Sequence, residues 1–286
     1  MSLLGTVVAY GRMIRFPHSV FALPFALTAA VLAAQESGIT GGQVFWIVVA
    51  MVAARSAAMG FNRLVDHAID ERNPRTAARE LPRGVVSRGE VVGFVVLSSA
   101  VFVLAAWMLN PFCFALSPVA LVIVFGYSYT KRLTSASHLV LGLALAVAPM
   151  GAWLAVQGRF DIVPVVLAVA VLLWVAGFDT IYACQDAEFD RGEELHSLPA
   201  RFGVARALRL ARLMHVLTIL LLLSLYWLAA LHPFYLVGVA GVAALLAWEH
   251  SLVRADDLSR VMQAFNLNGW VSLGYFVITG VAVWLG

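Results

Sequence analysis

The sequence has few charged residues and few cysteines for its length. Asp, Glu, Lys and Arg make up 12% of the 286 residues, and 62% are hydrophobic. A typical soluble domain is about 25% charged and about 45–50% apolar. A soluble globule of this size would need more polar surface, so the composition excludes a soluble enzyme and a disordered chain. The two cysteines, Cys113 and Cys184, lie far apart within apolar runs and do not indicate a disulfide scaffold.

The charges that are present are concentrated in two short windows. Residues 62–90 and residues 179–212 each hold 11, which is together 22 of the 35 charged residues. Most of the remaining chain consists of long apolar runs without strand-like alternation. Such runs form helices in lipid, where backbone polar groups must be satisfied within the segment. The sequence therefore predicts an all-α membrane protein with two polar regions.

Nine apolar runs are candidates for crossing a bilayer, which takes about 20 residues. They cover approximately residues 16–34, 43–62, 90–109, 112–128, 138–156, 162–183, 213–230, 233–249 and 266–285. The fourth run is the weakest, because it is short and contains Pro118. We expect about nine transmembrane helices in a single domain over residues 1–286.

The positions of Arg and Lys predict the orientation of these helices. If the N-terminus and the long loops lie on one side, that side holds 17 of the 19 Lys and Arg residues. The exceptions are Arg55, inside the second span, and Arg159 on the other side. The positive-inside rule then places the N-terminus and the long loops in the cytoplasm, as in a multi-pass protein of the inner membrane. We expect the bilayer as a partner, and no nucleic acid.

Two predicted helices end in matching polar motifs. Each motif has residues at positions i, i+4 and i+8, which share one helix face. The second helix ends with Asn62, Asp66 and Asp70, and the sixth with Tyr182, Asp186 and Asp190. Asp179, seven residues before Asp186, is expected on nearly the same face.

Carboxylates spaced in this way suit magnesium. Mg²⁺ takes one or two carboxylates and completes its shell with water and substrate phosphate oxygens. One such motif alone would most simply be a solvated helix end. Two copies, each closing an apolar helix at matched depth, favour a site that holds Mg²⁺ against a diphosphate.

Basic residues near the acidic motifs complete this hypothesis. Arg75 and Arg79 follow the first motif at a spacing that could share a face, and Lys131, the only lysine, follows the fourth predicted helix. Guanidinium groups suit phosphate oxygens. Arg55 lies inside a span, where a charge is costly and usually functional. It could bind an acidic group of a substrate below the metal, or make a salt bridge within the bundle.

With both acidic motifs placed, the chain resembles the UbiA family of intramembrane prenyltransferases over nearly its whole length. The resemblance rests on Asn62-x3-Asp66-x3-Asp70, Arg75-Thr76-x2-Arg79-x-Leu81-Pro82-x-Gly84, Tyr127-Ser128-x2-Lys131-Arg132 and Asp179-x2-Tyr182-x3-Asp186-x3-Asp190. It implies nine helices around a central cavity under cytoplasmic loops. It also implies Mg²⁺-dependent transfer of a polyprenyl group from an allylic polyprenyl diphosphate to an aromatic acid in quinone biosynthesis.

The resemblance also implies roles for individual residues. Asp66, Asp70, Asp186 and Asp190 would hold Mg²⁺, with Asn62 supporting them; Arg75, Arg79 and Lys131 would bind the diphosphate; Arg55 and Tyr182 would face the acceptor. The runs Arg79-Glu80-Leu81-Pro82 and Phe16-Pro17-His18-Ser19 depart from the pattern of members that act on 4-hydroxybenzoate. They are more similar to a sister branch, so the acceptor is either 4-hydroxybenzoate, for ubiquinone, or 1,4-dihydroxy-6-naphthoate, for menaquinone.

Two other functions use acidic groups in membranes. An ion transporter would need polar residues through the whole membrane depth, whereas here the acidic residues stop at one end of the helices and the other halves are apolar. A lipid phosphotransferase that depends on Mg²⁺ carries its acidic motif on one segment, whereas this chain has two separated motifs. Both remain alternatives to prenyl transfer.

Overall fold

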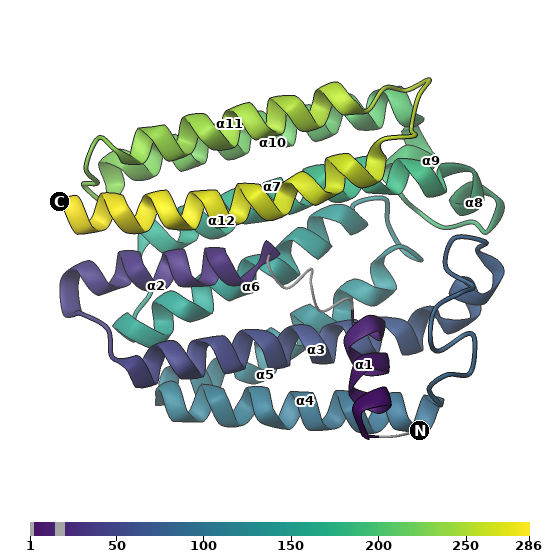
Figure 1. Cartoon of the computed structure of the whole chain (residues 1–286), viewed down its shortest axis with the longest axis horizontal. Helices are drawn as coiled ribbons and strands as arrows, with labels where there is room; N and C mark the ends of the chain where they lie inside the picture. Colours follow the sequence, from purple (N-terminus) through teal and green to yellow (C-terminus); the bar gives the residue numbers. More distant parts are fainter. Residues whose placement is uncertain (1–2, 15–20) are drawn as a thin grey trace.

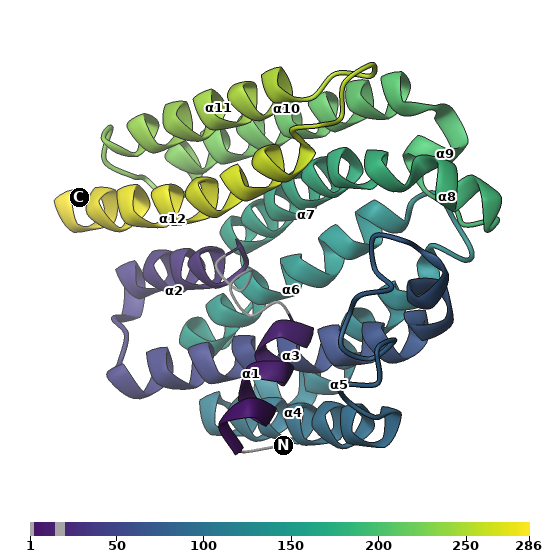
Figure 2. The same ribbon diagram turned by 45° about the vertical axis from the view of Figure 1, so that its right-hand side comes forward.

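The protein is helical throughout the part that the computed structural model describes, which is residues 3–14 and 21–286. Its elements are α1 (Leu3–Met13), α2 (Leu23–Ser37), α3 (Gly41–Arg72), α4 (Arg88–Leu109), α5 (Pro111–Thr130), α6 (Ser137–Gln157), α7 (Ile162–Ala183), η2 (Cys184–Asp186), α8 (Ala187–Gly192), α9 (Leu198–Phe202), α10 (Val204–Leu228), α11 (Tyr235–Leu252) and α12 (Val261–Leu285). The long helices run side by side along the long axis of the molecule, and α1 crosses α3 steeply (Figures 1 and 2).

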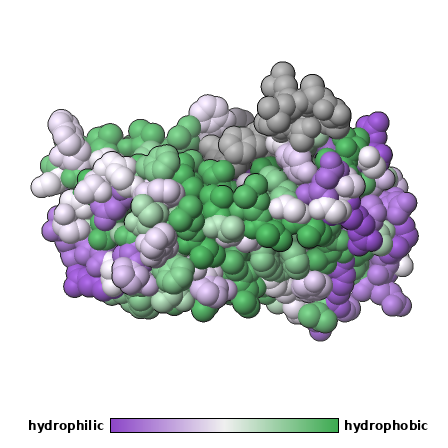
Figure 3. All heavy atoms as spheres, turned by 90° about the horizontal axis from the view of Figure 1, so that it is seen from below, coloured by the Kyte–Doolittle hydropathy of each residue, from purple (hydrophilic) through white to green (hydrophobic). Residues whose placement is uncertain are grey.

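Eight helices in the described ranges are long and apolar enough to cross a membrane, which confirms the predicted multi-pass helical bundle. They are α3, α4, α5, α6, α7 with its continuation to Gly192, α10, α11 and α12. The first predicted span, 16–34, corresponds to α2, which has only 15 residues; positions 16–20 lie outside the described residues. Large side chains such as Trp107 and Val122 are 62% and 72% exposed. Figure 3 shows an apolar band between two polar ends on one face of the molecule, as lipid contact requires.

Several helices extend beyond the apolar runs that predicted them. The second run ends near residue 62, but α3 continues as one helix to Arg72, so its acidic motif lies within regular helix, as its spacing predicted. The seventh predicted span starts at 213, but α10 begins at Val204, where basic residues already belong to the helix. Pro118 does not shorten the fourth span, because α5 runs unbroken from Pro111 to Thr130. The polar ends of these helices extend beyond their apolar, membrane-spanning segments. An apolar run therefore marks only part of each helix.

The polar connections gather at one end of the bundle. Residues 73–87, α8, α9 and the connection from α11 to α12 all lie at the right of Figure 1, and the C-terminus lies at the opposite end. Ser87 and Glu90 form a capping box that starts α4 directly after the first of these connections. The two charge-rich windows of the sequence are therefore neighbours in space.

Close helix packing fixes the position of α7, which carries the second acidic motif. A Cβ atom at Gly142 of α6 would lie 2.2 Å from the backbone oxygen of Leu172, so α6 and α7 touch through their backbones. On its other side α7 is held by buried polar side chains: Trp174 Nε1 donates to Asn268 Oδ1 at 2.7 Å, and Asn268 Nδ2 donates to Glu249 Oε1 at 2.9 Å. These contacts connect α7 to α11 and α12.

Candidate active site

A cavity of about 740 Å³ opens among α2 to α7 and Phe265 of α12. It begins among the acidic residues at the polar end of the bundle and reaches Ile47 near the start of α3. From Asp70 to Ile47 the helix rises about 34 Å at 1.5 Å per residue. Apart from its polar mouth, the cavity is lined mainly by Ala, Leu, Val and Met side chains. Its shape and lining suit a long apolar chain with a charged head group.

The first acidic motif forms one wall of the cavity mouth, as predicted. Asp66 is 4% exposed and accepts a hydrogen bond from Asn62 Nδ2 at 3.0 Å. Its carboxylate also pairs with Lys131 Nζ at 2.6 Å and with Arg132 Nη2 at 3.0 Å. The structure thus brings the predicted Lys131 to the predicted Asp66, and it adds Arg132, which the sequence analysis assigned to no role.

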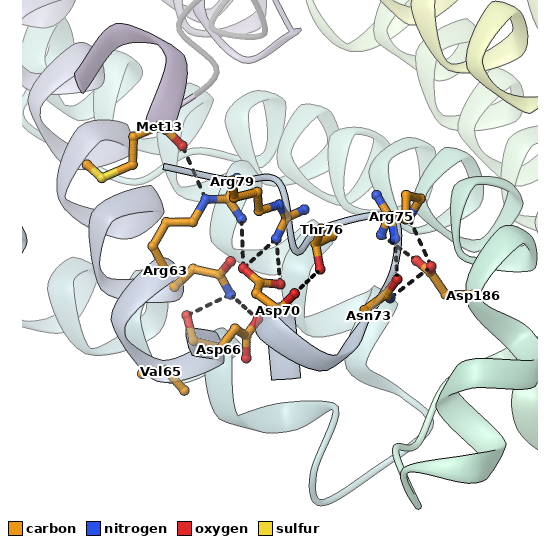
Figure 4. Close-up of polar contacts among 12 residues, drawn as sticks. Met13, Arg63, Val65, Asp66, Asp70, Asn73, Arg75, Thr76, Arg79 and Asp186 are labelled. Carbon is orange, nitrogen blue, oxygen red and sulfur yellow. Dashed lines mark hydrogen bonds and ion pairs between the residues drawn. The ribbon is translucent and has the colours of Figure 1, made fainter. Parts of the chain in front are cut away.

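Asp70 lies one turn further along the same wall (Figure 4). Arg79 Nη1 lies 2.7 Å from both carboxylate oxygens of Asp70, and Arg63 Nη1 lies 3.8 Å from one of them. Thr76 Oγ1 donates to the backbone oxygen of Asp70 at 3.0 Å. This contact folds the segment after α3 back over the motif, and that fold brings Arg79 to Asp70.

The second acidic motif, unlike the first, is not contained in one regular α-helix. Helix α7 ends at Ala183, a 3₁₀ turn carries Asp186, and the short α8 carries Asp190. Both carboxylates nevertheless line the cavity. The change from α-helix to 3₁₀ turn alters the rotation per residue, so the spacing of i, i+4 and i+8 no longer sets their directions.

Arg75 joins the two motifs across the mouth. Its Nε donates to Asp186 Oδ1 at 2.9 Å, its Nη2 to Asp186 Oδ2 at 2.5 Å, and its Nη1 to the Tyr182 hydroxyl at 2.8 Å. Asn73 Nδ2 also donates to Asp186 Oδ1, at 3.2 Å. Burial is the largest influence and lowers the pKa of Arg75, but the hydrogen bond to Asp186 and the nearby acidic groups raise it by more. Arg75 and Arg79 lie in turns and do not share a helix face.

Two further carboxylates of the site have polar partners that the sequence analysis missed. Ser197 Oγ donates to Asp190 Oδ2 at 2.7 Å. His138 Nδ1 lies 2.6 Å from Asp179 Oδ2. His138 and Ser197 come from other helix ends, and no sequence pattern places them beside these carboxylates.

Arg55 lines the cavity below the acidic mouth, as predicted, and its guanidinium also has a structural contact. Its Nη1 donates to the backbone oxygen of Ile14 at 3.0 Å, and Arg63 Nε donates to that of Met13 at 3.2 Å. Two arginines of α3 therefore bind carbonyl groups at the C-terminal end of α1, where a helix favours cations. Tyr182, predicted beside the acceptor, lies against Arg75 at the mouth.

An aromatic wall lies next to the mouth. The rings of Tyr182 and Phe265 are 4.8 Å apart, and Phe265 also contacts Phe21 and Phe178 at 5.1 and 5.6 Å. All four residues line the cavity. They come from α7, α12 and the start of α2, so only the folded bundle assembles them. Aromatic ring faces of this kind attract cations.

The carboxylates at the mouth have the chemistry of a divalent-metal site. Among residues 3–14 and 21–286 no three His, Cys, Asp or Glu side chains are close enough together to hold a metal ion as they stand. Each acidic residue is instead paired with a basic or hydroxyl group: Asp66 with Lys131, Asp70 with Arg79, Asp186 with Arg75 and Asp190 with Ser197. A magnesium diphosphate brings both signs of charge, so it can take over the carboxylates and the cations together. The donor set therefore fits Mg²⁺.

The apolar helical bundle is that of an integral-membrane protein. Its acidic, arginine-rich mouth above a deep apolar cavity provides a polar site for an apolar substrate. A sequence model of the UbiA prenyltransferase family matches residues 22–273, and the chain belongs to this family. It is 31% identical to the 4-hydroxybenzoate octaprenyltransferase of Vibrio parahaemolyticus over 96% of this chain and 98% of that protein. The corresponding protein of Aeromonas salmonicida is 32% identical over 80% of this chain and 79% of its own.

Solved structures agree with this assignment. A UbiA homologue from Aeropyrum pernix superposes with a TM-score of 0.84 and 34% identity, covering 94% of this chain and 98% of that one. A UbiA homologue from Archaeoglobus fulgidus, bound to DMAPP and Mg²⁺, has a TM-score of 0.70 over 95% and 99% of the two chains. At 18% identity the second likeness is one of fold.

Proposed function

We propose that the chain transfers a polyprenyl group from an allylic polyprenyl diphosphate to 4-hydroxybenzoate, with Mg²⁺ as cofactor. The observation that carries the proposal is the pairing of Asp66, Asp70 and Asp186 with basic residues at the mouth of a deep apolar cavity. The names of the bacterial relatives support the acceptor, and the DMAPP and Mg²⁺ of the archaeal homologue support the donor and the metal.

The residues at the mouth would bind the diphosphate and its metal. Asp66, Asp70, Asp186 and Asp190 would hold Mg²⁺, with Asn62 orienting Asp66. Bound Mg²⁺ supplies a positive charge that stabilises the departing diphosphate. Arg75, Arg79 and Lys131 would turn from the carboxylates to the phosphate oxygens and share that role.

The cavity below the mouth would hold the reacting groups. When the C–O bond breaks, the aromatic wall formed by Phe21, Phe178, Tyr182 and Phe265 would face the allylic cation. The apolar lining would exclude water, which would otherwise quench that cation. The prenyl tail would lie along the remaining depth of the cavity.

The acceptor would lie between α3 and α7. Arg55 on α3 lies below the first acidic motif and offers a cation for the acceptor carboxylate. Asp179 on α7 lies below Tyr182 and offers a base. The ring carbon ortho to the hydroxyl group would attack the allylic carbon, and a C–C bond would form. The proton displaced from that ring carbon would pass to Asp179. Diphosphate would leave with the electron pair of the broken C–O bond.

The topology follows from the same arrangement. Residues 1–286 would form one transmembrane domain in the inner membrane, with the arginine-rich end of the bundle in the cytoplasm, where soluble acceptor and diphosphate meet.

The direct test is an assay of purified protein with Mg²⁺ and a radiolabelled polyprenyl diphosphate. 4-Hydroxybenzoate and 1,4-dihydroxy-6-naphthoate are supplied in separate reactions. Prenylated 4-hydroxybenzoate is the expected product. Product with the naphthoate alone would change the acceptor but keep the reaction, and no product with either acid would overturn the proposal.

A further inference from the structure

His138 and Asp179 form a partly buried hydrogen-bonded pair in the cavity wall, next to the proposed metal ligands but not among them. The distance from His138 Nδ1 to Asp179 Oδ2 is 2.6 Å. The His138 side chain is 4% exposed and that of Asp179 is 23% exposed, and both line the cavity. Asp179 is therefore accessible from the cavity while its Oδ2 is hydrogen-bonded to His138.

A second hydrogen bond determines which nitrogen of His138 carries the proton. The backbone N–H of Leu198 donates to His138 Nε2 at 3.3 Å. A nitrogen that accepts must have its lone pair free, so the proton of the neutral ring is on Nδ1. Nδ1–H therefore donates to the Asp179 carboxylate. This donation orients the Asp179 carboxylate and occupies Oδ2, so that Oδ1 is the oxygen left to accept a proton.

Leu198 belongs to a short segment, residues 195–198, which lines the cavity through Leu195 and Ser197; we refer to it as the strap. The His196 N–H donates to the Lys131 backbone oxygen at 2.6 Å, and Ser137 Oγ donates to the His196 backbone oxygen at 3.2 Å. Ser197 starts α9 by accepting from the Ala200 N–H. These bonds hold the strap against the connection between α5 and α6, so the Leu198 N–H has a fixed direction toward His138.

We propose that His138 is a positioning residue that orients Asp179 toward the acceptor, and that the strap fixes the required tautomer of His138. The inference rests on the proposed prenyl transfer. In that reaction the ring carbon that forms the new C–C bond loses its proton, the C–H electron pair restores the aromatic ring, and Asp179 Oδ1 receives the proton. His138 exchanges no proton in this step and touches no substrate.

Three substitutions separate the two hydrogen bonds of His138. His138→Asn places an amide N–H near the position of Nδ1 and keeps the donation to Asp179. His138→Gln places an amide oxygen near the position of Nε2 and keeps only the bond from Leu198. His138→Leu removes both. His232→Asn is the matched control, because His232 is exposed at the other end of the bundle.

We expect His138→Leu and His138→Gln to lower kcat by about tenfold or more, since a general base contributes about 10²–10⁴-fold and its hydrogen-bonding partner a part of that. The KM for polyprenyl diphosphate should stay within about twofold of wild type, because binding at the mouth does not use His138. His138→Asn should recover most of kcat, and His232→Asn should equal wild type. Recovery by Gln in place of Asn, or a change confined to KM, would overturn the inference.

A double-mutant cycle tests whether His138 acts through Asp179. Asp179→Asn should lower kcat by itself, and adding His138→Leu should lower it no further. Additive losses would overturn the inference. Thermal unfolding in detergent identifies any variant that fails to fold, and for such a variant the comparison between Asn and Gln decides. A wild-type protein that prenylates no aromatic acid refutes the proposed function, whereas active wild type with unimpaired His138→Leu refutes this inference alone.

Discussion

Arg75 and Asp186, which are 111 residues apart in the chain, form a two-point ion pair across the mouth of the cavity. Both contacts use the edge of the guanidinium that carries Nε and Nη2, and the third nitrogen reaches Tyr182. Such a planar fork matches a carboxylate and matches a phosphate equally well. Under the proposed function, this group exchanges Asp186 for two oxygens of the diphosphate.

The first prediction concerns this fork. Arg75→Lys keeps the charge but loses the second contact, so the KM for polyprenyl diphosphate should rise by about tenfold, the equivalent of one charge-assisted hydrogen bond. Steady-state kinetics with varied diphosphate measures it. Arg83→Lys is the control, because Arg83 is exposed in the same connection. An unchanged KM in Arg75→Lys would remove Arg75 from the diphosphate site.

The second prediction concerns the carboxylates. Asp66→Asn and Asp186→Asn preserve shape but remove a negative charge, and each should lower kcat by at least about 100-fold, because metal ligands matter more than their hydrogen-bonding partners. Asp256→Asn, with its side chain 81% exposed in the connection to α12, should have no effect. Full activity in either site variant would contradict the metal assignment.

The third prediction concerns removal and addition of the metal. EDTA should abolish prenyl transfer, and Mg²⁺ should restore it. Because the carboxylates are already paired with Lys131, Arg79 and Arg75, Mg²⁺ alone should raise Tm little, whereas Mg²⁺ with a polyprenyl diphosphate should raise it by several degrees, or about 2–4 kcal/mol at saturation. A differential thermal-unfolding experiment measures both. An equally large shift with Mg²⁺ alone would show that metal binds without replacing these pairs.

The fourth prediction concerns Arg55. Arg55→Gln should raise the KM for 4-hydroxybenzoate by about tenfold or more and leave that for the diphosphate nearly unchanged, because only the acceptor carboxylate is within its proposed reach. Arg159→Gln, at an exposed position on the other side of the bundle, is the control. A lower Tm in Arg55→Gln would show that the hydrogen bond from Arg55 to the Ile14 backbone oxygen stabilises the fold. A larger effect on the diphosphate KM would assign Arg55 to the mouth.

The fifth prediction concerns the packing of α6 on α7. Gly142→Ala would place a Cβ atom 2.2 Å from the Leu172 backbone oxygen, which cannot move without displacing α7. The variant should lose about 1–3 kcal/mol of stability. Gly126→Ala, where nothing lies within 4 Å, should be neutral or slightly stabilising. Thermal unfolding in detergent compares them, and equal Tm values would show that the two helices can separate at no cost.

The sequence alone was enough to predict a bundle of membrane-spanning helices and the residue types at its polar end. Long apolar runs have one stable solution in lipid, the helix, because the backbone must satisfy its own hydrogen bonds. The spacing of Asn62, Asp66 and Asp70 correctly placed three side chains on one face of α3, because that segment is regular helix. The second motif is not contained in one regular helix, because α7 changes to a 3₁₀ turn after Ala183, so its spacing alone does not set the directions of Asp186 and Asp190.

Only the tertiary structure decided which charges pair and which residues share the cavity. Arg132, His138, Ser197 and Phe265 reach the site from helix ends far apart in the sequence, and no periodicity within one segment records a contact between segments. Burial supplies the physical reason for the pairing. A carboxylate taken from water must gain a partner, so each acid at the mouth takes the cation or hydroxyl that packing brings within reach.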